Sequence, residues 1–329
     1  MVTMMTASEA LSGPRVLVIR GGAIGDFILT LPAIRLLRDN IPDVRIEILG
    51  YKSIVEIAVS AGLAETVRNL EHGSMAKLFV PNVSLDRELL DYFRGFNLVV
   101  SYLYDPDGYF RGNMERIGVR TFLAASHHVE PGAGHAAAQL ARPLEKLAMY
   151  LEDPAPQIGL AVPAESSGGR PVIAIHPGSG SLKKNWPTAN WSRLGRELSE
   201  VFPHCRLALI TGEAEAERAV TQFMLEGWRG LDFLHWDQLP LTQLALNLST
   251  CAAFLGHDSG ISHLAAACGL PCVLLFGPTD AATWAPRNVG VRVLSDVSGD
   301  LQRMPFEIVR AAAGGLIEGL QDKKCARGL

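Results

Sequence analysis

Residues 252–280 read AAFLGHDSGISHLAAACGLPCVLLFGPTD, and this stretch decides the fold. A short apolar run ends at Gly256, small polar residues open an alanine-rich segment, and a second apolar run ends at Gly277. This pattern predicts a strand, a helix and a second strand, with the polar residues where the first strand meets the helix. Two strands joined in this way form the repeating unit of a parallel sheet.

The start of the predicted helix has the residues of an anion site. Asp258 and Ser259 are good N-cap types, and Gly260 lets another group approach the first N–H donors of the helix. Helix starts attract anions, above all phosphates, and His263 falls one turn into the helix, on a face that could reach the same anion. The alternative is an ordinary capped helix with one surface histidine. A matching site elsewhere in the chain favours the anion site.

Composition and charge argue against several classes of protein. The chain has 329 residues, enough for two domains, and its 48% hydrophobic and 19% charged residues are typical of a globular protein. A net charge of −4 lacks the basic field that nucleic acids require. No apolar stretch reaches the roughly 18 residues of a membrane span, so we expect at most peripheral membrane contact. Five cysteines without Cys-x-x-Cys spacing predict reduced thiols and a cytoplasmic location.

Strands and helices alternate through both halves of the chain. In the first half we expect strands at 16–19, 44–49, 98–102 and 119–123 and helices at 27–39, 86–93, 109–117 and 135–147. In the second half we expect strands at 171–175, 206–210 and 233–235 and helices at 191–202, 213–225 and 241–248, before the unit at 252–280. Residues 152–170 are rich in Pro, Ala, Ser and Gly and form the expected linker.

The alternation predicts an α/β protein with two Rossmann-like, doubly wound parallel-sheet domains that face each other across a cleft. We place an N-terminal domain at 1–160, a C-terminal domain at 161–304, and a last helix at 305–329 that could cross back to the first domain. Ligands of such sheets bind at the carboxyl ends of the strands, so the cleft is the expected site.

The first predicted strand ends in a glycine cluster, RGGAIGD at residues 20–26. Its Gly-Gly-x-x-Gly spacing, and the lack of an acidic residue at the end of the second strand, oppose a dinucleotide site. Asp26 lies at a helix start, where its carboxylate would repel a phosphate but can accept the proton of a neutral hydroxyl. Asp26 is therefore either a general base or a plain helix cap.

Two loops of the second half could complete an anion site. Residues 176–187 read HPGSGSLKKNWP, in which small residues can cradle phosphate oxygens and lysines can neutralise charge on a leaving diphosphate. Residues 211–218 read TGEAEAER and open a helix with three glutamates. One glutamate could accept hydrogen bonds from a ribose, although acidic residues in a first turn are normal capping chemistry.

Taken together, these motifs resemble glycosyltransferase family 9, the heptosyltransferases of lipopolysaccharide core assembly and their relatives. Three motifs occur in the family's order: Gly25-Asp26 with TLPA at 30–33, KNWP at 184–187, and DSGISH at 258–263. The resemblance runs from about residue 15 to residue 319. It implies the two-domain GT-B fold, inversion of the anomeric carbon, and no metal or other cofactor. A histidine that several members carry shortly after the Gly-Asp pair is Leu29 here.

The resemblance also implies a role for each matching residue. Asp26 would take the proton from the acceptor hydroxyl, and Lys184 would stabilise the departing diphosphate. The phosphates, ribose and base of the donor would contact Ser179, Gly180, Glu215, Leu239, Asp258, Ser259, Gly260 and His263. We assign acceptor binding to the first domain, where arginines could meet acidic or phosphorylated sugars. The acceptor candidates are Tyr104, Asp107, Arg111 and Arg120.

We therefore predict transfer of a sugar, heptose-like in view of the family, from a nucleotide-diphosphate donor such as ADP-heptose. The acceptor would be a hydroxyl of a lipopolysaccharide-core or related bacterial glycan or glycolipid. The protein would act in the cytoplasm, with at most peripheral contact with the inner membrane face. The alternatives are a nucleotide-sugar epimerase, a non-catalytic nucleotide-sugar-binding protein, and a metalloenzyme using His257, His263 and Cys268.

Overall fold

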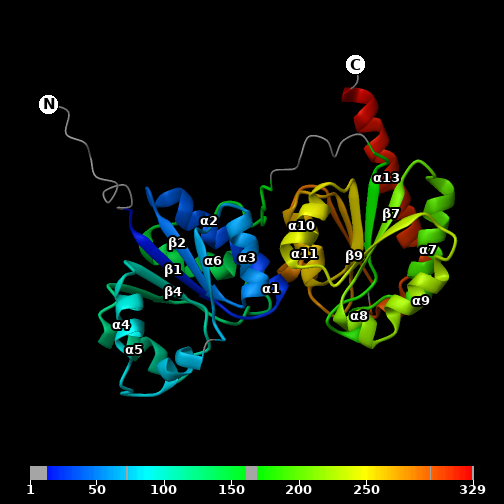
Figure 1. Ribbon diagram of the computed structural model, residues 1–329. Coiled ribbons are helices and arrows are strands. Elements are labelled where there is room, and N and C mark those ends of the chain that lie inside the picture. The colour runs from blue at the N-terminus through cyan, green and yellow to red at the C-terminus, as the bar shows by residue number, and fades with distance from the viewer. Residues whose placement is uncertain (1–12, 72, 161–168, 297, 328–329) are drawn as a thin grey trace. The chain divides into compact units, whose positions relative to one another are not determined.

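The computed structural model describes residues 13–71, 73–160, 169–296 and 298–327, and its strands form two sheets (Figure 1). The first sheet has five strands in the order β3-β2-β1-β4-β5, and the second has six in the order β11-β10-β9-β6-β7-β8. All neighbouring strands in both sheets run parallel. The predicted α/β class with two parallel sheets is confirmed.

The chain divides into two compact units. Two short segments from the N-terminal half of the sequence belong to the second unit. The first unit comprises residues 13–22, Thr30–Val129 and Ala137–Asp153. The second comprises the described residues from Pro154 onward together with Ala23–Leu29 and Glu130–Ala136. The Ala23–Leu29 segment packs on helix α11 (Gly260–Ala267), and His135 Nε2 lies 2.9 Å from the Ala285 carbonyl oxygen.

The first unit is built on strands whose central members are buried apolar runs, as expected for a sheet covered on both faces. Phe93, Phe110 and Met114 pack with Leu17 and Ile19 on one face, and helices α2 and α3 lie on the other (Figure 1). The strands are β1 (Arg15–Arg20), β2 (Arg45–Gly50), β3 (Thr66–Asn69), β4 (Leu98–Ser101) and β5 (Thr121–Ala124). The helices are α2 (Leu31–Asn40), α3 (Lys52–Ser60), η1 (Gly73–Phe79), α4 (Arg87–Arg94), α5 (Tyr109–Ile117), α6 (Ala136–Ala141) and η2 (Arg142–Leu147).

One long helix expected at 27–39 is in fact two. Helix α1 (Ile24–Ile28) ends before Thr30, and α2 begins at Leu31. Pro32 explains the break, because a proline has no N–H to donate to the carbonyl four residues earlier. This break lets α1 join the second unit while α2 stays with the first.

The second unit has a sheet with fully buried central strands. Trp191 of α7, Trp228 at the end of α9 and apolar residues of α13 cover one face, and α10 and α11 lie on the opposite face (Figure 1). The strands are β6 (Val172–His176), β7 (Arg206–Thr211), β8 (Phe233–Asp237), β9 (Ala253–His257), β10 (Cys272–Phe276) and β11 (Val291–Ser295). Apart from α1 and α11, the helices are η4 (Leu182–Lys184), α7 (Thr188–Val201), α8 (Glu213–Glu217), α9 (Val220–Gly227), α10 (Leu241–Ser249), α12 (Ala281–Trp284), η5 (Leu301–Arg303) and α13 (Phe306–Arg327).

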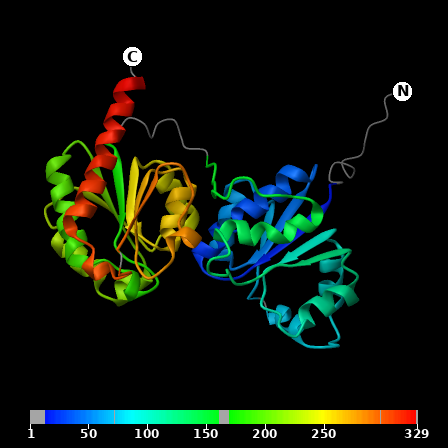
Figure 2. The ribbon, with the colours of Figure 1, turned by 180° about the vertical axis from the view of Figure 1, so that it is seen from behind.

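Helix α13 packs on the second sheet, beside α7, β9 and β10 (Figure 2). Its buried residues Val309, Ala312, Ala313 and Ile317 belong to the core of this unit. The described side chains of this helix thus do not show the return to the first domain that we considered. The start of the expected linker also packs on the second unit, since the Ile158 N–H donates to the Ala267 carbonyl at 2.7 Å. Residues 161–168 of the linker lie outside the described residues.

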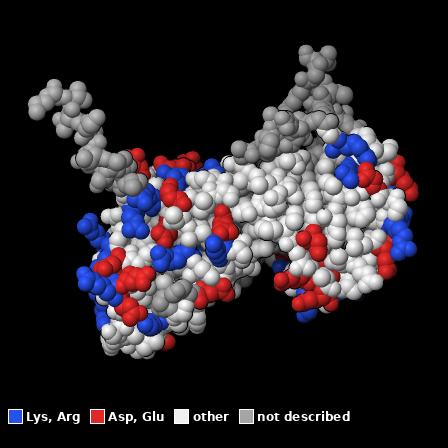
Figure 3. Space-filling model, in the orientation of Figure 1, with Lys and Arg blue, Asp and Glu red and all other residues white. Residues whose placement is uncertain are grey.

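Charged side chains of both signs are interspersed on the face shown in Figure 3. Among the described residues, no helix has both the length and the apolar character needed to span a membrane.

Candidate active site

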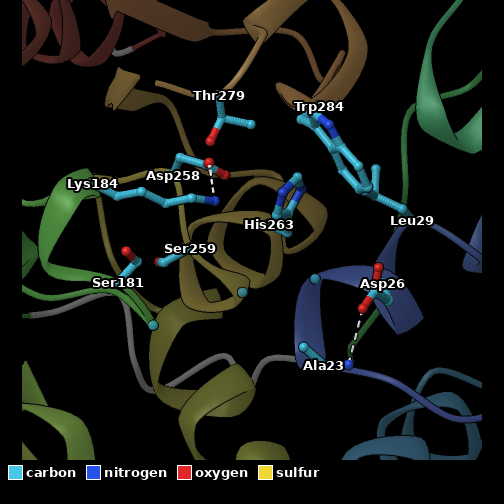
Figure 4. A pocket seen from close by; sticks show the side chains of 13 residues that line it. Ala23, Asp26, Leu29, Ser181, Lys184, Asp258, Ser259, His263, Thr279 and Trp284 are labelled. Carbon is cyan, nitrogen blue, oxygen red and sulfur yellow. Dashed lines mark hydrogen bonds and ion pairs between the residues drawn. The ribbon is translucent and has the colours of Figure 1, made fainter. Parts of the chain in front are cut away.

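A pocket of about 330 Å³ lies in the second unit, at the carboxyl ends of β6, β9 and β10 (Figure 4). This edge of a parallel sheet is where such folds bind ligands. Its lining includes Ala23, Gly25, Asp26 and Leu29 of the α1 segment; Gly180, Ser181 and Lys184 after β6; Asp258, Ser259, Gly260 and His263 at the start of α11; and Thr279 and Trp284 after β10. The structure therefore brings together seven of the ten residues predicted for catalysis and donor binding.

The start of helix α11 exposes free N–H donors to the pocket. Ser259 is the N-cap, and its Oγ accepts a hydrogen bond from the Ser262 N–H at 3.3 Å. Gly260 and Ile261 occupy the first two helical positions, where N–H groups have no acceptor within a helix. Those donors and the helix dipole favour a negatively charged ligand at this end.

Lys184 and Asp258 form an ion pair at the edge of the pocket. The Lys184 Nζ lies 2.6 Å from Asp258 Oδ2, and the Asp258 side chain is only 7% exposed. Figure 4 shows the lysine pointing toward this carboxylate. The carboxylate holds the ammonium group beside the helix start. Because the pair is formally neutral, the N–H donors of the helix remain the main source of positive potential there.

Asp26 caps helix α1 and also lines the pocket. Its Oδ2 accepts a hydrogen bond from the Ala23 N–H at 3.0 Å, which is a cap at the start of α1. The same side chain lines the pocket and is half-buried. A capping carboxylate that faces a pocket keeps a fixed orientation and can still meet a hydroxyl there.

Two glycines allow α1 to lie against the start of α11. A Cβ at Gly25 would stand 3.2 Å from His263 Cδ2, and a Cβ at Gly260 would stand 2.7 Å from Ile24 Cβ. The second distance is too short for any side chain without a shift of the backbone. Asp26 is thus held close to the anion site because both facing positions lack side chains.

His263 is buried between the two charged groups of the pocket, Asp26 and the Lys184–Asp258 pair (Figure 4). Burial lowers the pKa of His263 to about 4, although the carboxylates of Asp258 and Asp26 partly oppose this effect. Its Nδ1 has no hydrogen-bond partner among the described residues. A buried polar atom without a protein partner requires another partner, such as a water molecule or a ligand.

His257 joins the motifs of the site, and the sequence analysis assigned it no role of this kind. Its Nε2 accepts hydrogen bonds from the Trp186 backbone N–H at 2.7 Å and from the Trp191 indole N–H at 3.0 Å. Its Nδ1 lies 3.3 Å from the Gly178 carbonyl oxygen. Burial lowers the pKa of His257 to about 3, so the ring stays neutral and can serve as acceptor and donor together. This one ring connects the β6 loop with the segment that carries Lys184.

Replacing His257 with leucine is expected to lower the free energy of unfolding of the second unit by about 2–4 kcal/mol, because two buried N–H donors lose their acceptor. All five tryptophans lie in this unit, so tryptophan fluorescence during urea denaturation measures its unfolding alone. Trp191→Phe removes one of the two donors and should lower the free energy of unfolding by less than the leucine variant does. Equal losses for the two variants would contradict this role of His257.

Three predicted donor-site residues do not line the pocket. The Ser179 hydroxyl lies 2.8 Å from the Ser181 carbonyl oxygen and 2.6 Å from Asn185 Oδ1, inside the loop after β6. Glu215 is buried, and its Oε2 accepts the Gly212 N–H at 2.8 Å. Burial raises the pKa of Glu215, but contacts with His176 and Gly212 outweigh burial and leave the pKa lowered. Leu239 lies between β8 and α10.

The histidines do not form a metal site in the part of the chain that the structure describes, where no group of three or more His, Cys, Asp or Glu could hold a metal ion. Both ring nitrogens of His257 already meet protein groups. His257 is therefore not available as a ligand in the arrangement with His263 and Cys268.

Three of the four acceptor candidates line a pocket in the first unit. Tyr104, Asp107 and Arg111 belong to a pocket of about 490 Å³. Arg120 is exposed and does not line it.

The sequence analysis missed Thr279 and Trp284, which line the pocket of the second unit. Thr279 lies three residues after the end of β10, and the rule that ligands bind at the carboxyl ends of parallel strands could have indicated it.

Comparison with known proteins identifies the family. The model of glycosyltransferase family 9 (heptosyltransferase) matches residues 120–304, more than half of the chain. Lipopolysaccharide heptosyltransferase 1 of Pseudomonas aeruginosa is 27% identical over 289 residues, which cover 81% of this chain and 79% of that protein.

Solved structures share the fold. The family 9 glycosyl transferase of Veillonella parvula has a TM-score of 0.75 at 17% identity, covering 94% of this chain and 98% of that one. The E. coli heptosyltransferase WaaC with ADP has a TM-score of 0.70 at 16% identity, covering 92% and 99%. Because the family model spans most of the second unit and part of the first, the chain belongs to glycosyltransferase family 9 and is a glycosyltransferase.

Proposed function

We propose that this protein is an inverting heptosyltransferase that needs no metal ion or other cofactor. It would transfer heptose from an ADP-heptose-like donor to a hydroxyl of a lipopolysaccharide-core or related glycan acceptor. The observation that carries the proposal is the pocket that gathers the Asp26 carboxylate, Lys184 and the start of α11. The names of the relatives, which are lipopolysaccharide heptosyltransferases, support the choice of sugar and acceptor.

The diphosphate of the donor would lie at the start of α11. The N–H groups of Gly260 and Ile261 would donate to its oxygens, together with the Ser259 hydroxyl and the unpartnered Nδ1 of His263. The WaaC structure contains ADP, which supports a nucleotide diphosphate as the ligand class. Roles for Glu215 at the ribose, Leu239 at the base and Ser179 at the phosphates remain predictions.

The transfer step requires a proton acceptor and a stabilised leaving group. The acceptor hydroxyl would give its proton to Asp26 while its oxygen forms a bond to the anomeric carbon. The bond from that carbon to the diphosphate oxygen breaks, and its electron pair stays on the diphosphate. Attack from the face opposite the leaving group inverts the configuration. Lys184 and the helix donors would stabilise the charge that develops on the leaving oxygen.

The first unit would bind the acceptor, with Tyr104, Asp107 and Arg111 at its pocket. Arg120 lies outside that pocket, and its contribution to acceptor binding remains a prediction. We also propose that the protein acts in the cytoplasm, with at most peripheral contact with the inner membrane face.

The test incubates the whole protein with ADP-heptose, with and without a core glycolipid that lacks heptose. We expect ADP release only with the acceptor present, and a product of inverted anomeric configuration by NMR. A changed sugar without acceptor would indicate an epimerase. Thermal stabilisation by ADP-heptose without any product would indicate a binding protein; a ligand at 100 times its Kd adds about 2.7 kcal/mol to the free energy of unfolding.

A further inference from the structure

The pocket of the first unit lies at the carboxyl ends of β4 and β5 and is lined by residues of 101–111 and 122–127. We propose that it binds a neutral, hydroxyl-rich sugar ring of the acceptor, and that it disfavours acidic or phosphorylated sugars. This inference rests on the proposed function for two points: that the ligand of this pocket is the acceptor, and that ADP occupies the pocket of the second unit. The shape and charge of the pocket carry the rest.

An aromatic pair forms one wall of the pocket. The Tyr104 side chain is 64% exposed, and its ring centroid lies 4.6 Å from that of His127, with the planes tilted by 57°. A large aromatic ring that stays exposed at a pocket offers an apolar face with a polar tip. The C–H face of a sugar ring packs on such a surface, and its hydroxyls remain at the edge.

A hydrogen-bonded turn presents carboxylates beside this wall. The Gly108 N–H donates to the Asp105 carbonyl at 3.2 Å, and the Asp105 carboxylate accepts the N–H groups of Phe110 and Arg111 at 3.1 and 2.9 Å. Asp105 is thus engaged in holding the turn and the start of α5. Asp107 lies between these anchored positions, and no hydrogen bond or ion pair of its side chain occurs within the described residues. Its oxygens can accept sugar hydroxyls, as ionised carboxylates do.

The charge of the pocket excludes an anionic ring. Asp105 and Asp107 face a single arginine in the described lining, Arg111. The Nε of Arg111 already lies 3.1 Å from Glu115 Oε1. A phosphate or carboxylate would therefore meet two carboxylates and a guanidinium that has a partner, and like charges repel. This differs from our expectation that arginines here would select acidic or phosphorylated sugars.

The experiment compares two probes by saturation-transfer NMR with the whole protein, methyl α-D-mannopyranoside and its 6-phosphate. ADP is added in excess to suppress sugar binding in the second unit, and both probes are compared in the same buffer. We expect the neutral glycoside to bind at least about fivefold more tightly than its phosphate. Tyr104→Ala and Asp107→Asn should each weaken the neutral probe about fivefold.

Tyr150→Ala is the matched control, because Tyr150 is 65% exposed and lies outside the pocket. Failure of the neutral probe to bind, equal or tighter binding of the phosphate, or equal effects of Tyr104→Ala and Tyr150→Ala would each overturn the inference. The measurement uses no donor sugar, so a protein that discriminates the probes but transfers no heptose would refute the proposed function alone.

Discussion

Replacing Asp26 with asparagine is expected to lower kcat for sugar transfer by about 10³-fold, while the Kd for ADP changes by less than about twofold. The asparagine carbonyl can still accept the Ala23 N–H, which lies 3.0 Å from Asp26 Oδ2, so the cap of α1 is preserved. The amide cannot take a proton from a hydroxyl. Steady-state kinetics with ADP-heptose and calorimetric titration with ADP measure the two quantities.

Asp26→Ala is the companion variant, because it removes the cap as well as the base. It should reduce the stability of the second unit by about 0.5–2 kcal/mol beyond the effect of asparagine, the usual value of a lost cap. Its kcat for sugar transfer should fall about as far as that of Asp26→Asn. Retention of more than about a tenth of the activity by Asp26→Asn would assign the proton to another group.

Replacing Lys184 with alanine is expected to lower kcat by about 10²-fold and also to weaken ADP binding. The first effect comes from the charge that the lysine places near the leaving oxygen. The second arises because the Asp258 carboxylate, 2.6 Å from the ammonium and 7% exposed, is left without this cation at the anion site. A single variant therefore mixes two causes.

The double variant Lys184→Ala with Asp258→Asn separates them. Without the carboxylate, affinity for ADP should return to within about threefold of the parent protein, whereas kcat should stay low. The Kd for ADP and kcat are measured for the parent protein, the two single variants and the double variant, which together form a double-mutant cycle. Recovery of kcat together with affinity would show that Lys184 acts by offsetting Asp258 and has no separate part in the transition state.

The sequence predicted the central strands and the capped start of α11 because both depend on local patterns. The runs that became β9 and β10 are continuous and apolar, and every residue of both strands is buried. Ser259 caps α11 as its residue type predicts. Strands at the edges of the sheets were harder to predict from the sequence. Strand β3 reads TVRN with alternating exposure, and its polar residues are typical of a loop. Neither this strand nor β11 was expected.

Contacts between distant segments could not be derived from one sequence. Nothing in the residues around His257 indicates that its ring accepts two N–H groups from residues 71 and 66 positions away. The association of α1 with α11 depends on the fit between Gly25 and His263, which is a property of tertiary packing. Residue type therefore predicted Asp26 as a candidate base, while its surroundings required coordinates.

The short α1 segment has a practical consequence for dissecting this protein. A fragment beginning at Pro154 would contain the whole six-stranded sheet, yet it would lack Ala23, Gly25, Asp26 and Leu29, which line the pocket of the second unit. It would also uncover the His263 surface on which that helix rests. Ligand affinities measured on such a fragment would describe an incomplete pocket. A chimera that joins this half to another N-terminal domain would therefore have to keep the seven residues of Ala23–Leu29.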